Sequence, residues 1–269
     1  MLVYPQRHGF QNYWNLDQYF SLAIGKSINS IHSFPRSLPR FQQTLILFFI
    51  FNLCLSSPPP KKIYLIEDFE PLYENLNKEY GQHKVLPKGF ELATLVALSH
   101  YPELKNIHIR FILKETFIPL VSRPSISSMF KKKDKWEYLV IISNHSNEEM
   151  ETILLKNLSF NAQIGIIGHE LGHTVFYLNK KLGDMIGIGF NYINKKYRAD
   201  FEKDTDRRAV DHGLGWQLYD YAIFSRSLPD MTRENIDWID QYYMNGASIM
   251  NYMRSHPLYK KDLEKILPL

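Results

Sequence analysis

The pattern of apolar and polar positions predicts two helices early in the main part of the chain. The segment "LIEDFEPLYENLNKEY" (65–80) repeats apolar side chains at helical spacing. The segment "PKGFELATLVALSHYPEL" (87–104) does the same, and it predicts a helix that begins at Pro87 and ends before Pro102. Proline suits the first turn of a helix and interrupts a helix that runs into it, so both ends are marked.

Three extended segments follow these helices. They are rich in β-branched and aromatic residues, which favour strands, and they cover residues 106–113, 117–126 and 137–144. The last two flank the run "KKKDK" (131–135). The pattern therefore predicts a hairpin with a solvated lysine loop at its tip.

The remainder of the chain is predicted to be helical. One helix begins near Ser159 or Asn161 and carries an apolar stripe formed by Ile164, Ile167, Leu171 and Val175. A small sheet followed by helices predicts an α+β fold rather than a doubly wound one. We expect a small, mostly antiparallel sheet packed beside the helix that begins near Ser159, with a helical C-terminal part.

Three further helices are predicted after that one. They cover about 199–211, 218–224 and 232–243. Gly213 follows the first of them and is expected to take the left-handed conformation that ends a helix. The glycine-rich apolar stretch 183–193 is interpreted as a packed connector.

The first 62 residues differ from the rest and are interpreted as a leader. The apolar run Thr44–Leu55 is twelve residues long, about 18 Å as a helix, against a hydrocarbon core of about 30 Å. Arg36 and Arg40 precede it, and small residues and the proline-rich linker "SSPPPKK" follow. These features indicate a signal-like segment or a short membrane anchor, with the main domain at 63–269.

Composition narrows the class of protein. Apolar residues make up 45% and aromatic residues 14% of the 269 residues, which is enough for a sizeable core. The net charge of +4 comes from 32 basic and 28 acidic residues mixed along the chain, so we expect no nucleic-acid partner. The single cysteine, Cys54, excludes a disulfide framework and a cysteine-rich zinc module.

The stretch "IIGHELGHTVFY" (166–177) carries candidate metal chemistry. His169 and His173 are four residues apart, so on a helix both rings lie on one face and can bind one ion. Glu170 is rotated by about 100° from His169 and is predicted to act as the general base. Zinc would lower the pKa of a water to about 7, and Glu170 would accept its proton and pass a proton to a leaving nitrogen.

A third ligand is needed to complete such a site. The pattern with a third histidine would require glycine at 176 and histidine at 179, where the chain has Phe176 and Asn179. The segment "FEKDTDRRAVDHG" instead offers Glu202 and Asp206 on one helical face. Glu202 is predicted to be the third ligand of Zn²⁺, and Asp206 is predicted to orient a ligand histidine.

These residues resemble the glutamate-zincin metallopeptidases, in which an HExxH motif is followed by an ExxxD motif. The closest likeness is to the CaaX-prenyl-protease and HtpX-like peptidases and to uncharacterised bacterial HExxH proteins, because Asp206, Ala209 and Val210 follow Glu202 as in those peptidases. The segment "SHPLYKKDLEKIL" is similar to their downstream His-Pro segment, so the resemblance implies that His256 stabilises an oxyanion. It also implies a zincin-like fold.

The resemblance predicts a zinc-dependent endopeptidase that acts on a peptide or protein substrate. An extended peptide is expected to add to the edge of the sheet, and Pro119 and Pro124 would suit an edge strand. The alternatives are a non-catalytic zinc- or peptide-binding protein with the same fold and a membrane-associated scaffold. The leader predicts an exported or cell-envelope location, with membrane association through residues 44–55.

Other candidate residues have a structural interpretation. His212 lies at a helix C-terminus, where a cation is favoured, and capping is preferred to metal binding. Tyr242, Tyr243 and Tyr252 could donate to an oxyanion, but packing in the core is the preferred reading in a chain with 17 tyrosines.

Overall fold

The computed structural model describes residues 58–116, 118–146, 151–229 and 231–266. Thr44–Leu55 and nearly all of the predicted leader lie outside these ranges. Within them, no helix is both long enough and apolar enough to cross a lipid bilayer.

A mixed four-stranded sheet has the order β1-β2-β4-β3. Its strands are β1 (Lys84–Val85), β2 (His108–Leu113), β3 (Leu120–Pro124) and β4 (Glu137–Ile142). The predicted hairpin is confirmed, since β3 and β4 pair antiparallel. The other two pairings, β1 with β2 and β2 with β4, are parallel, so the expectation of a mostly antiparallel sheet is wrong. Alternating polarity identifies a strand but not its neighbour, and β4 inserts between two strands that are consecutive in the chain.

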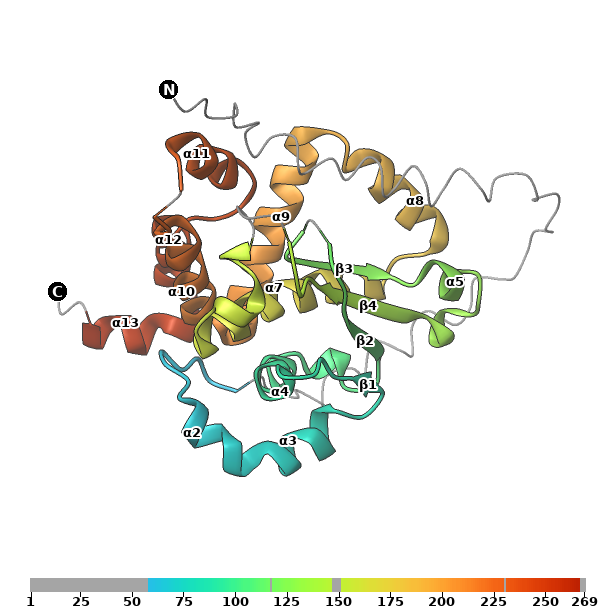
Figure 1. Cartoon of the computed structure of the whole chain (residues 1–269), viewed down its shortest axis with the longest axis horizontal. Coiled ribbons are helices and arrows are strands. Elements are labelled where there is room, and N and C mark those ends of the chain that lie inside the picture. Colours follow the sequence, from blue (N-terminus) through green and yellow to red (C-terminus); the bar gives the residue numbers. More distant parts are fainter. Residues whose placement is uncertain (1–57, 117, 147–150, 230, 267–269) are drawn as a thin grey trace, which may run out of the picture. The chain divides into compact units, whose positions relative to one another are not determined.

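Helices make up most of the described residues and accompany this small sheet, so the α+β class is confirmed (Figure 1). They are α2 (Ile66–Phe69), α3 (Tyr73–Tyr80), α4 (Glu91–Ser99), α5 (Ile126–Met129), α7 (Phe160–Leu178), α8 (Leu182–Asn191), α9 (Lys195–Ala209), α10 (Gly215–Arg226), α11 (Arg233–Tyr242), α12 (Gly246–Ser255) and α13 (Lys260–Ile266).

Several helix ends differ from the predicted ones for local reasons. The helix predicted over 65–80 is divided by the 3-10 turn η3 (Glu70–Leu72), whose second residue is Pro71. Helix α4 begins at Glu91 rather than Pro87, since Gly89 before it has φ of +86°. The stretch 183–193 is mainly helix α8 rather than a connector, and α12 was not predicted.

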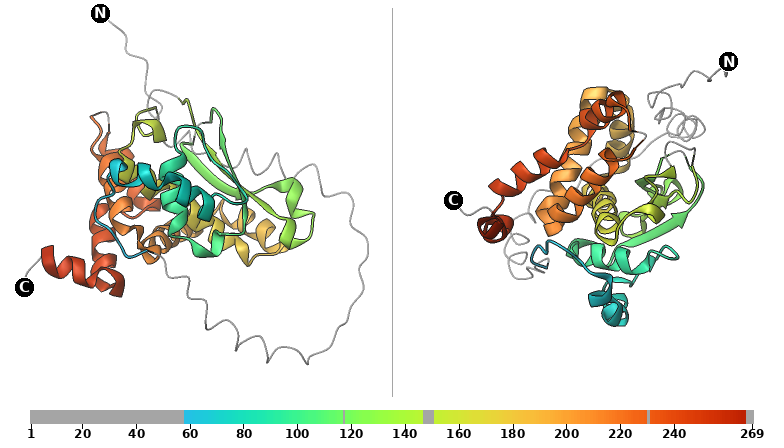
Figure 2. Two further views of the ribbon diagram at one scale, coloured as in Figure 1. Left: turned by 90° about the horizontal axis from the view of Figure 1, so that it is seen from below. Right: turned by 60° about the vertical axis from the view of Figure 1, so that its left-hand side comes forward.

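Helix α7 lies at the centre of the described structure. Ser159 caps its N-terminus, because its side chain accepts a hydrogen bond from the N–H of Ala162. Helix α7 packs against α4, α9, α10 and the edge strand β3, and the right-hand view of Figure 2 places it between the sheet and the C-terminal helices. Most of its residues are buried, which explains why its sequence is apolar on more than one face.

Gly165 allows α10 to approach α7 closely. A Cβ atom at this position would lie 2.3 Å from the carbonyl oxygen of Gln217, far inside van der Waals contact. Only glycine fits between the two backbones. The contact fixes α10 against the helix that carries His169 and His173.

The connection between α9 and α10 is a π-helical turn, η7 (Val210–Leu214). Gly213 has φ of +86° there, so the predicted left-handed glycine is confirmed. A Cβ at Gly213 would also lie 3.1 Å from Nδ1 of His100. The turn directs the chain from the helix carrying Glu202 back along α7.

Lys84 ties strand β1 to the loop that precedes β2. Its Nζ lies 2.9–3.1 Å from the carbonyl oxygens of Gln82, Leu104, Lys105 and Ile107, which share its three N–H donors. The bonds to residues 104, 105 and 107 join segments that are about twenty residues apart in the chain.

We expect Lys84→Met to lower the free energy of unfolding by about 1–3 kcal/mol, because the methionine keeps the alkyl chain but leaves partly buried carbonyl groups without their donor. Urea denaturation followed by circular dichroism measures the loss. Lys88→Met is the matched control, since Lys88 is exposed and should change stability by no more than about 0.5 kcal/mol. Equal stability of the two variants would show that the Lys84 bonds contribute nothing net.

Candidate metal centre

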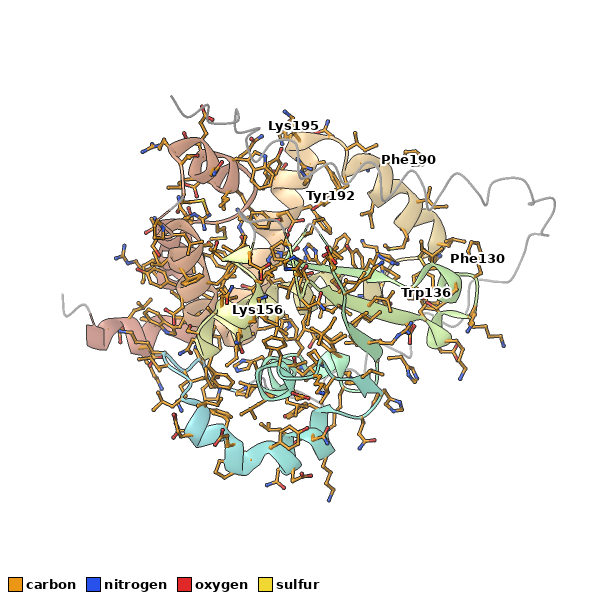
Figure 3. All side chains as sticks on the ribbon, in the orientation of Figure 1. Phe130, Trp136, Lys156, Phe190, Tyr192 and Lys195 are labelled. Carbon is orange, nitrogen blue, oxygen red and sulfur yellow. The ribbon has the colours of Figure 1, made fainter. Side chains whose placement is uncertain are left out.

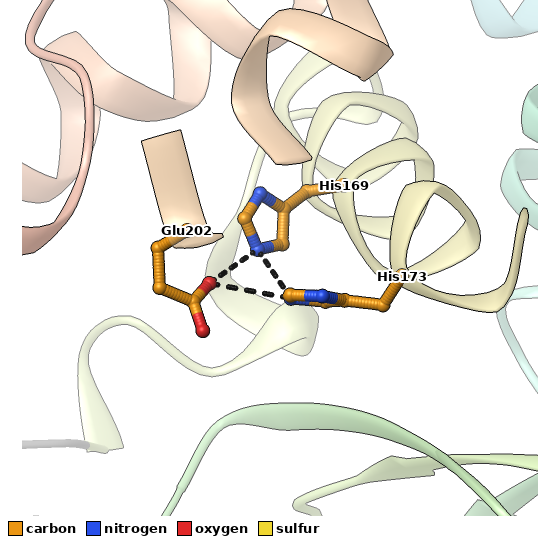
Figure 4. A group of neighbouring side chains, drawn as sticks. All are labelled: His169, His173 and Glu202. Atoms are coloured by element: carbon orange, nitrogen blue, oxygen red, sulfur yellow. Dashed lines mark hydrogen bonds and ion pairs between the residues drawn. The ribbon is translucent and has the colours of Figure 1, made fainter. Parts of the chain in front are cut away.

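Two helices bring together His169 and His173 from α7 and Glu202 from α9 (Figure 4). Nε2 of His169 lies 3.1 Å from Oε2 of Glu202 and 3.1 Å from Nε2 of His173. Nε2 of His173 lies 3.2 Å from the same carboxylate oxygen. The three atoms form a nearly equilateral triangle, and all three residues are buried, with at most 6% of their surface exposed.

The partners of the two Nδ1 atoms, which lie on the side of each histidine ring away from the triangle, determine which ring nitrogens carry protons. Nδ1 of His169 lies 2.8 Å from Oδ1 of Asp206, which can only accept a hydrogen bond while ionised. Nδ1 of His173 lies 3.2 Å from Oγ1 of Thr205, whose own proton is donated to the carbonyl oxygen of Phe201. Both Nδ1 atoms therefore act as donors, and the Nε2 atoms of the neutral rings turn a lone pair toward the triangle.

Three electron-pair donors at this separation repel one another unless a cation lies among them. Four ligands arranged tetrahedrally at about 2.0–2.1 Å from an ion are about 3.3–3.4 Å apart, close to the 3.1–3.2 Å observed. His169, His173 and Glu202 therefore fit the donor set, spacing and burial of a metal site. The group could bind a metal ion.

A proton is the other cation that could relieve the repulsion. Burial lowers the pKa of His169, but the hydrogen bonds to Asp206 and Glu202 outweigh burial and hold the pKa well above its ordinary value. Burial raises the pKa of Glu202, but His173 and His169 outweigh burial and hold this pKa far below its ordinary range. A metal ion would thus take the place of a proton at His169.

Glu170 is buried next to His169, His173 and Glu202, and one of its two carboxylate oxygens is free within the described part of the chain. The backbone N–H of Ser122 in β3 lowers the pKa of the Glu170 carboxylate slightly. Among the described residues, its Oε2 has no hydrogen-bond partner. Burial raises the pKa of Glu170, although the neighbouring His173 and His169 partly oppose this. A buried carboxylate with a raised pKa and a free oxygen is suited to accepting a proton.

Asp206 links the cluster to the C-terminal part of the chain. Its Oδ1 accepts from His169, and its Oδ2 accepts from the backbone N–H of Met244 at 2.7 Å. Asp206 lies where the sequence argument expected a group that orients a ligand histidine. Met244, which follows α11, was not expected in this role, because a backbone donor leaves no signal in a sequence.

Tyr192, at the end of α8, is a second residue that sequence reasoning missed. Its hydroxyl donates to Oε1 of Glu202, the oxygen that does not face the two histidines. Burial, followed by the charge of Glu202, raises the pKa of Tyr192 well above its ordinary value, so it remains a donor. The bond fixes which carboxylate oxygen of Glu202 faces the triangle. Nothing distinguished Tyr192 from the other tyrosines in the sequence.

His256 lies apart from the cluster. It precedes the 3-10 turn η8 (Pro257–Tyr259), where its Nδ1 accepts from the N–H of Leu258 and its Nε2 lies 3.4 Å from Asp211. Among the described residues, its recorded contacts include neither Glu170 nor any of the three metal-facing side chains. The geometry gives no support to an oxyanion role for His256, since its ring is used to cap a turn.

His212 caps a helix end, as the sequence argument preferred. Its Nδ1 lies 2.7 Å from the carbonyl oxygen of Arg208, and its Nε2 lies 2.7 Å from Glu103. Of the tyrosines considered earlier, Tyr252 donates to Asp211, whereas the ring of Tyr243 lies 5.8 Å from that of His169. Tyr243 thus packs beside the cluster.

Comparisons with known proteins identify no relative. No protein-family model matches the chain, and neither a curated protein nor a solved structure matches it.

We expect Tyr192→Phe to weaken metal binding by about 10–100-fold, because a ligand carboxylate that loses its outer hydrogen bond is less well oriented. Competition with a chromophoric chelator measures the affinity. Tyr197→Phe is the control on α9, and Glu202→Ala should cause a larger loss than Tyr192→Phe. Unchanged affinity in Tyr192→Phe would show that the hydroxyl does not position Glu202.

Proposed function

We propose that the protein is a zinc-dependent endopeptidase of the glutamate-zincin type. The observation that carries the proposal is the buried triangle of His169, His173 and Glu202, with the free carboxylate oxygen of Glu170 beside it. A purely structural metal site has no need for a base at this place. The zincin-like identity of the α+β fold and the likeness to the CaaX-prenyl-protease and HtpX-like peptidases are parts of the same proposal.

Zinc is the ion that best suits these donors. Two imidazole nitrogens and one carboxylate oxygen are a common ligand set of catalytic zinc, which keeps a fourth position open. His169 and His173 come from one helix and Glu202 from another, so the three donors are held by packed secondary structure rather than by loops. When bound, zinc would supply Lewis acidity and a water of lowered pKa.

Glu170 would carry the proton in the reaction. Its free oxygen would accept the proton of the attacking water and then deliver it to the nitrogen of the departing peptide. Burial supports this role, because a carboxylate with a raised pKa is a stronger proton acceptor.

The register of β3 supports a peptide substrate. Ser125 donates its N–H to the carbonyl of Glu137 across the β3–β4 pair, so residues in phase with Ser125 direct their backbone groups to β4. The alternate residues Leu120 and Ser122 direct their backbone N–H and C=O groups away from β4, to the outer edge of β3. No strand within the described residues pairs with that edge. An extended peptide added there would pass Glu170, whose pKa the backbone N–H of Ser122 lowers.

We expect Glu170→Gln to retain bound zinc and to lose at least about 100-fold in peptide cleavage, the lower range for loss of a general base. Elemental analysis and digestion of a fluorogenic peptide library measure the two properties. Chelation should abolish cleavage by the wild-type protein, and added zinc should restore it. Equal cleavage by both proteins would refute the role of Glu170, whereas bound zinc without any wild-type cleavage would favour a non-catalytic zinc-binding protein.

We expect N-methylation of a bound peptide to weaken its affinity in an alternating pattern. Peptide N–H groups that pair with β3 occur at every second residue, so methylation should matter at one set of positions and be tolerated at the other. Binding to the Glu170→Gln variant, measured by fluorescence anisotropy, avoids cleavage. A uniform effect, or none, along the peptide would contradict strand addition.

A further inference from the structure

Two segments of the chain together have a larger positive net charge than the whole protein. Residues 126–135 and 180–196 contain eight lysines and two aspartates, a net charge of +6, whereas the entire chain has +4. The rest of the chain is therefore slightly acidic. The positive net charge of the chain, which appeared to be spread along the sequence, therefore comes from these two segments.

The two segments are neighbours in the structure. Nζ of Lys133, in the loop after α5, donates to the carbonyl oxygen of Tyr177 at 3.0 Å. Tyr177 lies in the last turn of α7, and the second segment begins three residues later at Lys180. In Figure 1, α5 and α8 both lie on the right-hand side.

The same segments expose large apolar side chains. Phe130 (62% exposed), Phe190 (59%) and Ile193 (58%) are the three most exposed large apolar residues among those the structure describes. Ile126 and Ile186 add 36% and 42%. Figure 3 labels Phe130 and Phe190 at the outer boundary of the side chains, beside α5 and α8. We call these five residues, with the lysines of both segments other than Lys133, the lysine-flanked face.

Rotation of helix α8 could not bury its exposed apolar side chains. Its opposite side already packs on the core through Leu182, Met185 and the buried Ile188, and Tyr192 is bound to Glu202. The exposed residues therefore face solvent because the inner positions are filled. Lysine pairs stand at both ends of the helix, at 180–181 and 195–196.

We propose that the lysine-flanked face binds the surface of a membrane that contains anionic phospholipids. Apolar side chains would enter the boundary between headgroups and acyl chains, and the lysines around them would reach the phosphates. This surface does not depend on the proposed peptidase activity. Its occupant is argued from charge, since a second copy of the chain would bring two positively charged faces together.

Co-sedimentation of the full chain with vesicles tests the proposal. Vesicles of phosphatidylcholine alone are compared with vesicles of phosphatidylcholine and phosphatidylglycerol. We expect the wild type to prefer the anionic vesicles and to lose this preference at high salt. The triple substitution of Lys131, Lys132 and Lys135 by Gln should lower the partition coefficient by about 100-fold, at roughly fivefold for each lysine. Phe190→Asn with Ile193→Asn should also weaken binding.

Matched controls separate this face from general charge and from the rest of the chain. Lys88, Lys260 and Lys261, all exposed, are replaced by Gln together, and Leu65→Asn is combined with Leu258→Asn. These controls should bind as the wild type does, including any binding through residues 44–55, which all variants share. Circular dichroism checks that every variant is folded.

Three results would overturn the proposal. The first is a wild type that does not prefer anionic vesicles, and the second is equal losses in the face variants and the controls. The third is a change of oligomeric state or of single-stranded RNA binding in the Phe190 and Ile193 variant while vesicle binding is unchanged. That outcome would assign the face to a second copy or to a nucleic acid.

Discussion

Three lone pairs that converge inside the protein impose the main constraint on this structure. His169, His173 and Glu202 direct their donor atoms to one point at separations of 3.1–3.2 Å, with almost no access to solvent. Such an arrangement is unfavourable unless a cation compensates for the repulsion and for the lost hydration. Its persistence requires a scaffold stiff enough to resist relaxation. Helix α7 meets this need, since it is buried along most of its length and clamped by α10 at Gly165.

The polar groups around the triangle distribute this constraint over distant parts of the chain. Thr205 holds one ring, Asp206 holds the other, and Tyr192 holds the carboxylate. Because Asp206 in turn accepts from Met244, the loop after α11 contributes to the orientation of His169. Each partner satisfies a buried atom that would otherwise be left without a hydrogen bond. The site is therefore a property of the fold as a whole and not of the motif alone.

Local regularities made part of this arrangement predictable from sequence. The spacing of His169 and His173, and that of Glu202 and Asp206, is fixed by helix geometry, so their relative placement on each helix followed directly. A helix start near Ser159 or Asn161 and the left-handed Gly213 were also expected, because both depend on a few adjacent residues. These inferences required only short-range physics.

Other features depend on long-range packing and could not be read in advance. The order β1-β2-β4-β3 depends on which strand pairs with which, and polarity patterns do not encode that choice. Tyr192 and the Met244 amide gained their roles only when α8 and the α11–α12 loop reached the cluster.

The Met244 contact also sets an order in time. During synthesis from the N-terminus, the three metal-facing side chains leave the ribosome before the amide that fixes one of them. The site thus reaches its final geometry only after most of the chain has been made, so a metal ion would meet the complete set of donors late in folding.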